Sequence, residues 1–324
     1  MTKLPAGYLL RHPREDELSA VQALFDAAES ADCGEPRVSD FDVVASARDP
    51  RRDYPRNGWV VEAPGGELAA FGGVQWMPPG SGDSRQVVHP DHRGRGLGEA
   101  LIDVIGRRAA QLAAQAPPEA PATLTVWCED IKTQRRAALV ARGYAKVRES
   151  FIMRIDLGPD YEAARMPDGF SIRTFRPDRD ELAVYQASEE AFADDFHHDY
   201  ATYEQWRAYA VDHRWFRPDL WFIAWRGQQI AGECLVLHGD DEWLVDSLSV
   251  RRPWRQRGLA TGLLTRGLAA ARDGGAEVVR LEVDAQNPTG ALAVYQAVGM
   301  RVERRFEVFE KRLTSTGEPA APRR

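Results

Sequence analysis

The sequence has few cysteines, few lysines and no long apolar run. Its three cysteines, Cys33, Cys128 and Cys234, form no metal-type spacing and cannot all pair, which predicts free thiols in a reducing compartment. The absence of any run of 18 or more apolar residues predicts that no segment spans a membrane. The first residues show no cationic segment followed by an apolar core, so we expect no secretion signal. Together these absences predict a cytoplasmic protein.

Excess positive charge is also lacking. The net charge of −7 argues against a nucleic-acid-binding protein, which would usually be basic. Arginine dominates the cations, since lysine occurs only at four positions, and with the many alanines this indicates a GC-rich bacterial genome. The apolar fraction of 44% and charged fraction of 28% are ordinary for a globular protein.

An internal repeat organises the chain. VHPDHRGRGLG, which begins at Val88, returns as VRRPWRQRGLA from Val250, with Arg93 and Arg255 162 residues apart (255 − 93). The hairpin-like runs starting at Gly58 and Leu220 keep the same offset, and Gly143 matches Gly299 at a slightly shorter one. A length of 324 residues also favours two domains. The sequence therefore predicts a duplicated domain.

Each repeat predicts an α/β architecture. The pattern reads as strand, helix, a hairpin, a third strand, a glycine loop, a helix, a strand, a helix and a closing strand. Turn-forming residues cluster between the repeats and at the C-terminus. We expect an N-terminal domain over 1–157, a linker over 158–169, a C-terminal domain over 170–313 and a disordered tail over 314–324.

The two glycine loops have the chemistry of a phosphate-binding site. Each lies between a predicted strand and a predicted helix, where small residues let backbone N–H groups approach an anion and the helix N-terminus adds partial positive charge. Neither loop has the Walker A or the dinucleotide-binding spacing. The alternative is a glycine-rich turn with solvated arginines, but that reading does not explain two copies in one register.

The pattern Arg-x-x-Gly-x-Gly/Ala of these loops resembles the signature of the GNAT superfamily of N-acetyltransferases. The resemblance covers nearly the whole chain as a tandem pair of GNAT-like domains, and it implies an α+β mixed sheet in each domain. It also implies acetyl-CoA as the cosubstrate, with its pyrophosphate in the loop. The implied binding residues in the second repeat are Leu248, Ser249, Val250, Arg255, Gln256, Arg257, Gly258, Leu259 and Ala260, and those in the first are Val88, Arg93, Gly94, Arg95, Gly96 and Gly98.

A second family signature, Asn-x-x-x-Ala-x-x-x-Tyr, is matched from Asn287 to Tyr295. The resemblance implies that Asn287 lies near the pantetheine arm of the coenzyme and that Tyr295 lies near its sulfur. Tyr295 could protonate the departing thiolate. Alternatively it is a helix tyrosine packed on the core.

The base that removes a proton from the amine is less defined. Strand alternation places Asp246, Leu248 and Val250 on one face, opposite Val245 and the serines at 247 and 249. We expect Asp246 to be the base, with Glu242 as the second choice. Either acid could instead bind a cationic substrate or lie in solvent.

The first repeat departs from the family pattern. Leu139 stands where Tyr295 lies in the second repeat, and Ile131 stands where Asn287 lies. Leucine cannot donate a proton, so we expect the first domain to be catalytically degenerate, although its intact loop could still hold CoA.

The acceptor site should include polar and aromatic residues that follow the first helix of the second repeat. The candidates are Asp195, His197, His198 and Trp215. The adjacent histidines lack a third ligand at suitable spacing, so we expect no metal.

The resemblance implies an N-acetyltransferase in which the primary amine of a small molecule attacks the thioester directly. The acceptor could be an amino sugar, an amine-bearing metabolite or an antibiotic. A tandem with one degenerate unit is similar in organisation to mycothiol synthase, which acetylates the cysteinyl amine of a pseudodisaccharide. Acetylation of a protein amine is a further alternative, and a non-catalytic CoA-binding or sensing module is one of another class. We expect no nucleic-acid or membrane partner, and either a monomer or a homodimer.

Overall fold

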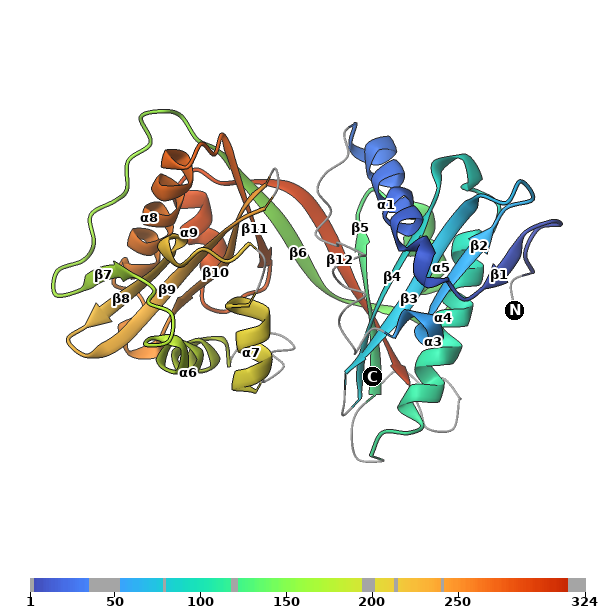
Figure 1. The fold of residues 1–324 in the computed structure, drawn as a ribbon, viewed down its shortest axis with the longest axis horizontal. Helices are drawn as coiled ribbons and strands as arrows, with labels where there is room; N and C mark the ends of the chain where they lie inside the picture. The colour runs from blue at the N-terminus through green and yellow to red at the C-terminus, as the bar shows by residue number, and fades with distance from the viewer. Residues whose placement is uncertain are drawn as a thin grey trace. The chain divides into compact units, whose positions relative to one another are not determined.

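The structure is a computed structural model that describes residues 3–34, 53–77, 80–117, 122–193, 202–212, 215–239 and 242–313. The chain divides into two compact units, here called unit 1 (Met1–Arg148 with Phe306–Arg324) and unit 2 (Glu149–Arg305). Each unit is a mixed sheet with helices on both faces (Figure 1). No helix among the described residues has the length and apolarity to cross a membrane. The tail over 314–324 lies outside the described residues.

In unit 1 the strand order is β1-β2-β3-β4-β5-β12, and every pair is antiparallel except β4 with β5. The described elements are β1 (Leu9–Arg11), η1 (Glu15–Glu17), α1 (Leu18–Cys33), α3 (Tyr54–Asn57), β2 (Gly58–Glu62), β3 (Leu68–Met77), β4 (Ser81–Val88), η2 (Pro90–His92), α4 (Leu97–Ala113), β5 (Ala122–Glu129) and α5 (Thr133–Val140).

In unit 2 the strand order is β6-β11-β10-β9-β8-β7, with only β10 and β11 parallel. The elements that begin in this unit or run into it are β6 (Ala145–Asp156), β7 (Ser171–Thr174), α6 (Glu181–Phe192), α7 (Tyr203–Ala210), η3 (Pro218–Leu220), β8 (Trp221–Arg226), β9 (Gln229–His238), β10 (Trp243–Val250), η4 (Arg252–Trp254), α8 (Leu259–Asp273), β11 (Val278–Asp284), α9 (Ala291–Ala297) and β12 (Arg301–Leu313).

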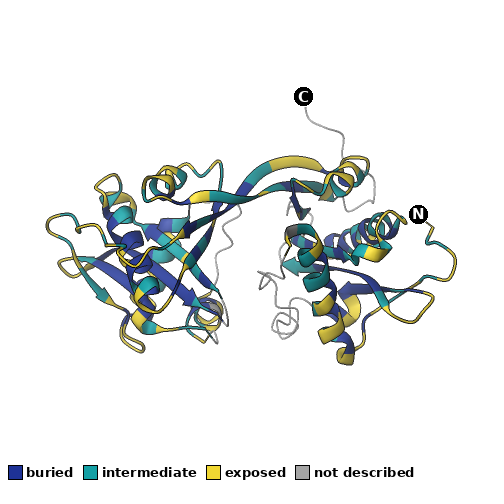
Figure 2. Ribbon diagram, turned by 90° about the horizontal axis from the view of Figure 1, so that it is seen from above, coloured by how far each residue is buried: buried dark blue, intermediate teal, exposed yellow. Residues whose placement is uncertain are grey.

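The sheet of unit 2 separates two apolar cores. On β8 and β9, Phe222 and Cys234 pack beneath α8 and α9, whereas Trp221, Ile223 and Leu235 pack with α6 and α7 on the opposite face. This alternation follows from the two-residue period of a strand. Figure 2 shows the central strands mostly dark blue and the outward helix surfaces teal and yellow, as expected for a sheet covered on both sides.

The two closing strands are exchanged between the repeats. Residues 150–156 of β6 pair with β11, and residues 306–313 of β12 pair with β5. The division between the units therefore falls within these two strands and not within 158–169, so the expected domains 1–157 and 170–313 need correction at their last strands. An exposed sheet edge is covered equally well by either strand, because an antiparallel ladder is made by the backbone.

The segment expected to be a linker packs on α8. The backbone amide of Ala164 donates to Thr265 Oγ1 at 3.0 Å. A Cβ added to Gly262 would come within 2.6 Å of the Met166 sulfur, so this glycine permits the close approach.

Candidate active site

The two glycine loops have the same backbone conformation. Gly94 and Gln256 have φ of 73° and 61°, and the N-cap residues Gly96 and Gly258 have φ of 80° and 77°. No side chain caps the N-terminus of α4 or α8 among the described residues. The first-turn N–H groups of both helices therefore retain the capacity to bind an anion, as the glycine pattern predicts. The left-handed Gln256 indicates local strain of roughly 1–2 kcal/mol.

The signature arginines hold these loops in place. Arg255 Nε donates to the carbonyl of Val250 at 3.0 Å and its Nη2 to the carbonyl of Ala191 at 2.9 Å, which ties the loop to the ends of β10 and α6. Arg93 Nη1 forms an ion pair with Asp32 at 2.6 Å. Arg257 is exposed and makes no side-chain hydrogen bond or ion pair to the described part of the chain, so it is the cation that faces solvent beside α8.

The strand entering the second loop contains a β-bulge. Val245 pairs with Val236 and Ser247 with Leu235, so Asp246 is an extra residue on β10. Val245, Leu248 and Val250 all pack in the core beneath α8, whereas Ser247 faces β9 on the side of α6. The expected alternation holds for Leu248 and Val250 opposite Ser247, but it is wrong at Val245, which shares their face because the inserted residue reverses the faces across the bulge.

The bulge coincides with a separation of β10 from β11. Among the described residues, the two strands pair only at Leu244 with Arg280. In unit 1 the equivalent strands pair over four positions, from Ser81 with Thr123 to Ser84 with Val126, and β4 pairs with β3 without a bulge. Unit 2 thus opens a wedge between its parallel strands earlier than unit 1, next to the residues 248–250 that were expected to contact acetyl-CoA.

A buried carboxylate lies on β9, the neighbour of β10 on the side away from β11. Glu233 on β9 pairs with Ser249 and is only 3% exposed. Trp221 Nε1 donates to its Oε2 at 2.6 Å, and Ser247 Oγ donates to its Oε1 at 3.3 Å. The side chain of Ser188, on α6, hydrogen-bonds to the same carboxylate. Glu233 was missed at the sequence level, where the acids flanking the bulge were preferred.

Burial raises the pKa of Glu233 to about 7, partly offset by the hydrogen bonds from Ser188, Trp221 and Ser247. The charge of Asp246 raises it further. A carboxylate whose pKa lies near neutral pH can accept a proton from an ammonium group and release it to solvent, which is the property required of a general base. Acids with strongly shifted pKa values are common among functional residues.

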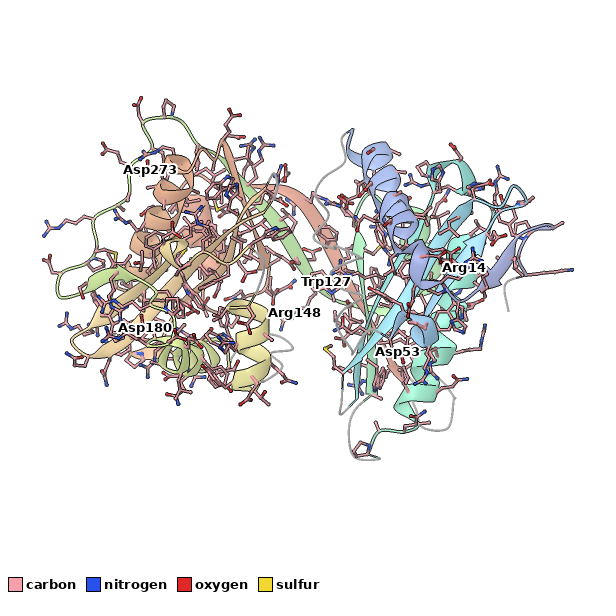
Figure 3. The ribbon with its side chains drawn as sticks, in the orientation of Figure 1. Arg14, Asp53, Trp127, Arg148, Asp180 and Asp273 are labelled. Carbon is pink, nitrogen blue, oxygen red and sulfur yellow. The ribbon has the colours of Figure 1, made fainter. Side chains whose placement is uncertain are left out.

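Helix α6, which carries Ser188, is held by hydrogen bonds at both of its ends. Asp180, labelled in Figure 3 at the start of this helix, is only 5% exposed. Its carboxylate accepts hydrogen bonds from both Nη atoms of Arg173 at 2.5 and 2.8 Å and from the amide of Arg176 at 2.8 Å. At the other end of α6, Arg255 binds the carbonyl of Ala191. These contacts fix the helix over the sheet face that carries Glu233.

The two acids preferred from the sequence have other environments. Glu242 forms an ion pair with Arg280 at 3.3 Å, and Arg280 also binds Glu303 at 2.8 Å. Glu242 therefore takes part in a charge network on the strands. Asp246 is exposed at the bulge, with its charge close enough to influence Glu233.

Tyr295 and Asn287 lie on either side of the turn that starts α9. Tyr295 is 7% exposed and packs in the core beneath α8, with its helix next to β11. Asn287 Oδ1 accepts a hydrogen bond from the amide of Thr289 at 2.8 Å, and Gly290 begins the helix with φ of 78°. The hydrogen bond that Asn287 accepts in this turn thus gives the asparagine of the second signature a structural role.

The positions of Tyr295 and Glu233 are apolar in unit 1. Leu139, which is fully buried, lies where Tyr295 lies in unit 2, because Tyr144 N donates to Leu139 O as Met300 N donates to Tyr295 O. Phe71 lies where Glu233 lies, since it pairs with Val87 in the way that Glu233 pairs with Ser249. Phe71 is fully buried among apolar residues.

The expected acceptor residues are only partly described. Asp195, His197 and His198 lie outside the described residues. Trp215 is half-buried and contacts the turn between β9 and β10, where a Cβ added to Gly239 would approach its ring to 3.2 Å. Among the described residues, no group of three or more His, Cys, Asp or Glu side chains could hold a metal ion.

Comparison with known families matches both repeats. Residues 21–117 and 183–300 match the model of the Acetyltransferase (GNAT) family. A mycothiol acetyltransferase of Thermomonospora curvata is 33% identical over 72% of this chain and 75% of its own length. A mycothiol acetyltransferase of Catenulispora acidiphila is 28% identical over 92% of this chain and 96% of its own length.

Solved structures share the arrangement. A GCN5-related N-acetyltransferase from Sphaerobacter thermophilus has a TM-score of 0.83 and 32% identity, covering 96% of this chain and 97% of its own. A tandem GNAT protein from the clavulanic acid biosynthesis pathway has a TM-score of 0.68 at 20% identity, over 97% of this chain and 99% of its own, which supports the fold alone.

Proposed function

The chain belongs to the acetyltransferase (GNAT) family, and we propose that its unit 2 transfers an acetyl group from acetyl-CoA to the primary amine of a small molecule. The observation that carries this proposal is the buried Glu233 beside the bulge of β10, in the same unit as Tyr295. Apolar residues stand at both positions in unit 1, which supports unit 2 as the reacting unit.

The site fits acetyl-CoA as substrate. The uncapped N-terminus of α8 and the left-handed Gly258 offer backbone N–H groups to its pyrophosphate. Arg255 shapes this loop, and Arg257 supplies a solvent-facing cation beside it. The wedge between β10 and β11 offers the backbone of residues 248–250 to the pantetheine arm and thioester. Asn287, whose side chain accepts a hydrogen bond in the turn before α9, is proposed to lie near the pantetheine arm.

In the proposed reaction Glu233 accepts the proton that the ammonium group must lose. Because Glu233 is almost fully buried, Ser247, whose hydroxyl contacts it, or a water passes that proton inward. The neutral nitrogen then forms a bond to the carbonyl carbon, and the carbon–sulfur bond breaks. The acylated nitrogen loses its surplus proton to solvent, and Tyr295 donates a proton to the departing thiolate and regains one from solvent, which yields the amide and free CoA. In this reaction Asp246, which is exposed, faces the substrate. Glu242 has a structural role through its ion pair with Arg280.

The acceptor is proposed from the named relatives. Because mycothiol acetyltransferases are 28–33% identical over most of their length, the cysteinyl amine of a pseudodisaccharide is the first acceptor to test. Amino sugars and peptides with a free N-terminus represent the other acceptor classes. We expect Trp215, with Asp195, His197 and His198, to contribute to acceptor binding.

The test is release of CoA thiol from acetyl-CoA in the presence of a panel of these amines. We expect turnover with at least one small amine and loss of turnover in Glu233→Gln. Binding of acetyl-CoA without turnover for any amine would favour a non-catalytic CoA-binding module and overturn the proposed activity.

A further inference from the structure

The helices α5 and α9 occupy equivalent places in their units. The amide of Tyr144 donates to the carbonyl of Leu139 at 3.2 Å, and the amide of Met300 donates to that of Tyr295 at 3.0 Å. Both bonds close the C-terminal turn of the helix, and both residue pairs are related by one offset (300 − 144 and 295 − 139 are both 156). The residues of the two helices can therefore be compared position by position.

This comparison places Arg135 of α5 at the position of Ala291 of α9. Arg135 is half-buried, and its Nε is enclosed without a hydrogen-bond partner in the described part of the chain. Burial lowers the pKa of its guanidinium, and the nearby Cys128 and Asp83 oppose that change. A long cationic side chain thus occupies a space for which unit 2 provides only a methyl group.

The neighbours of Arg135 lie on opposite faces of the sheet. Cys128 on β5 packs in the core beneath α4, where α5 also lies. Asp83 is on β4 at an even spacing from Val87, which packs in the core beneath α1, so Asp83 projects toward the face of α1. Arg135 lies in the first turn of α5, which follows the end of β5 that no longer pairs with β4 beyond Ser84 and Val126. Its enclosed Nε is therefore placed beside the point where these two strands separate.

We infer that Arg135 closes, in unit 1, the slot that receives the pantetheine arm of acetyl-CoA in unit 2. The chain then binds one acetyl-CoA although it has two glycine loops in the same conformation. The inference rests on the proposed function only in taking the wedge of unit 2 as the place of the arm. The pantetheine arm carries no charge, so it cannot compensate a guanidinium that it meets in a narrow, partly dehydrated gap.

The loop of unit 1 is also engaged within its own unit. Arg93 is paired with Asp32, and Lys132 approaches the same carboxylate at 3.4 Å. Arg95 Nη1 donates to the hydroxyl of Tyr8 at 3.0 Å. The basic residues around the first loop therefore stabilise unit 1 internally, which agrees with a structural use of this loop.

The experiment is the binding stoichiometry of CoA, measured by isothermal titration calorimetry on the full chain and on two reciprocal variants. Arg135→Ala gives unit 1 the residue found in unit 2, and Ala291→Arg gives unit 2 the residue found in unit 1. We expect one site in the original chain, two in Arg135→Ala with the second at least tenfold weaker, and none in Ala291→Arg. The double variant should bind one CoA, in unit 1.

Two sites in the original chain, or an unchanged stoichiometry in Arg135→Ala, would overturn the inference. The number of CoA sites in the original chain and in Arg135→Ala tests the inference independently of catalysis. Failure of the proposed function would appear separately, as absent turnover. Thermal unfolding followed by circular dichroism checks that each variant folds. If Arg135→Ala does not fold, the other two proteins still test the inference. Two CoA sites in the original chain, or CoA binding by Ala291→Arg, would overturn it.

Discussion

Glu233 of unit 2 and Phe71 of unit 1 occupy the same position in their sheets. Glu233 pairs with Ser249 and Phe71 with Val87, and the members of both pairs are 162 residues apart between the repeats (233 − 71 and 249 − 87). Phe71 fills an apolar core, whereas Glu233 introduces an ionisable group at 3% exposure. Burying a carboxyl is costly unless it is hydrogen-bonded, so a difference at this position points to chemistry in unit 2.

Replacement of Glu233 by Gln should lower kcat by about 100-fold or more, because general base catalysis typically contributes that much. With the pKa of Glu233 at about 7, kcat/KM of the original protein should rise with pH through neutrality as the carboxylate forms. In the variant, kcat/KM should no longer rise as Glu233 ionises, and it should rise only with deprotonation of the amine substrate. A steady-state pH profile of both proteins checks the prediction, and an unchanged rise in the variant would assign it to another group.

The same carboxyl should make stability depend on pH. Its pKa is about 7 in the folded chain and about 4.5 in the unfolded one, so the folded state binds the extra proton between these values. The stabilisation is complete below pH 4.5 and is lost as the pH rises through 7. The difference in unfolding free energy between the original protein and Glu233→Gln should fall by roughly 3 kcal/mol over this range. Urea unfolding from pH 4.5 to 8 measures it, and a constant difference would contradict the raised pKa.

Removal of the Tyr295 hydroxyl should slow the reaction. Tyr295→Phe keeps the buried ring in the core beneath α8 but removes the proton donor, so kcat should fall while the KM for acetyl-CoA changes little. Tyr144→Phe is the matched control, because Tyr144 is also buried but belongs to unit 1. Equal losses in both variants, or none in Tyr295→Phe, would remove this hydroxyl from the mechanism.

The loop arginines should differ in their effect on acetyl-CoA. Arg255→Ala removes the hydrogen bonds to Val250 and Ala191 that hold the second loop, and the KM for acetyl-CoA should rise about tenfold or more. Arg93→Ala breaks the ion pair with Asp32 and should leave both kinetic constants nearly unchanged. Initial rates at varied acetyl-CoA test the pair. The reverse pattern would identify unit 1 as the reacting unit.

The strand exchange predicts which fragment folds. A fragment of residues 149–305 contains the strand that covers β11, so it should give a cooperative thermal transition. A fragment of residues 158–313 contains the expected linker and C-terminal domain but lacks residues 150–156, so the edge of β11 would be open. It should be less stable or aggregate. Circular dichroism melts compare the two, and similar stability would argue that each repeat can use its own closing strand.

The repeat pattern was sufficient to predict the α/β units, the two loops and the family, which the comparisons confirm. Loop glycines are informative because a left-handed residue at the start of a helix strongly favours glycine, as Gly96 and Gly258 show. The degeneracy predicted from Leu139 stays a prediction, and the equivalent place of this residue and Tyr295 is consistent with it.

The closing strands show where local pattern is insufficient. Val147 and Phe151 in β6 have the same spacing as Val302 and Phe306 in β12, with charged residues between them in both strands. Either strand could therefore pair with either open edge. The choice depends on the path of the whole chain, which a pattern of apolar residues within one strand does not contain.

The sequence by itself determined the duplication, the two glycine loops and the unit that retains Tyr295, because these depend on residue type at fixed spacing. Only the tertiary structure decided the environment of the acids. An added residue at Asp246 reverses the faces of β10, and hydrogen bonds from β8, β10 and α6 meet at Glu233. Burial and hydrogen bonding between distant segments set the pKa of a carboxyl, and they exist only once the chain is folded.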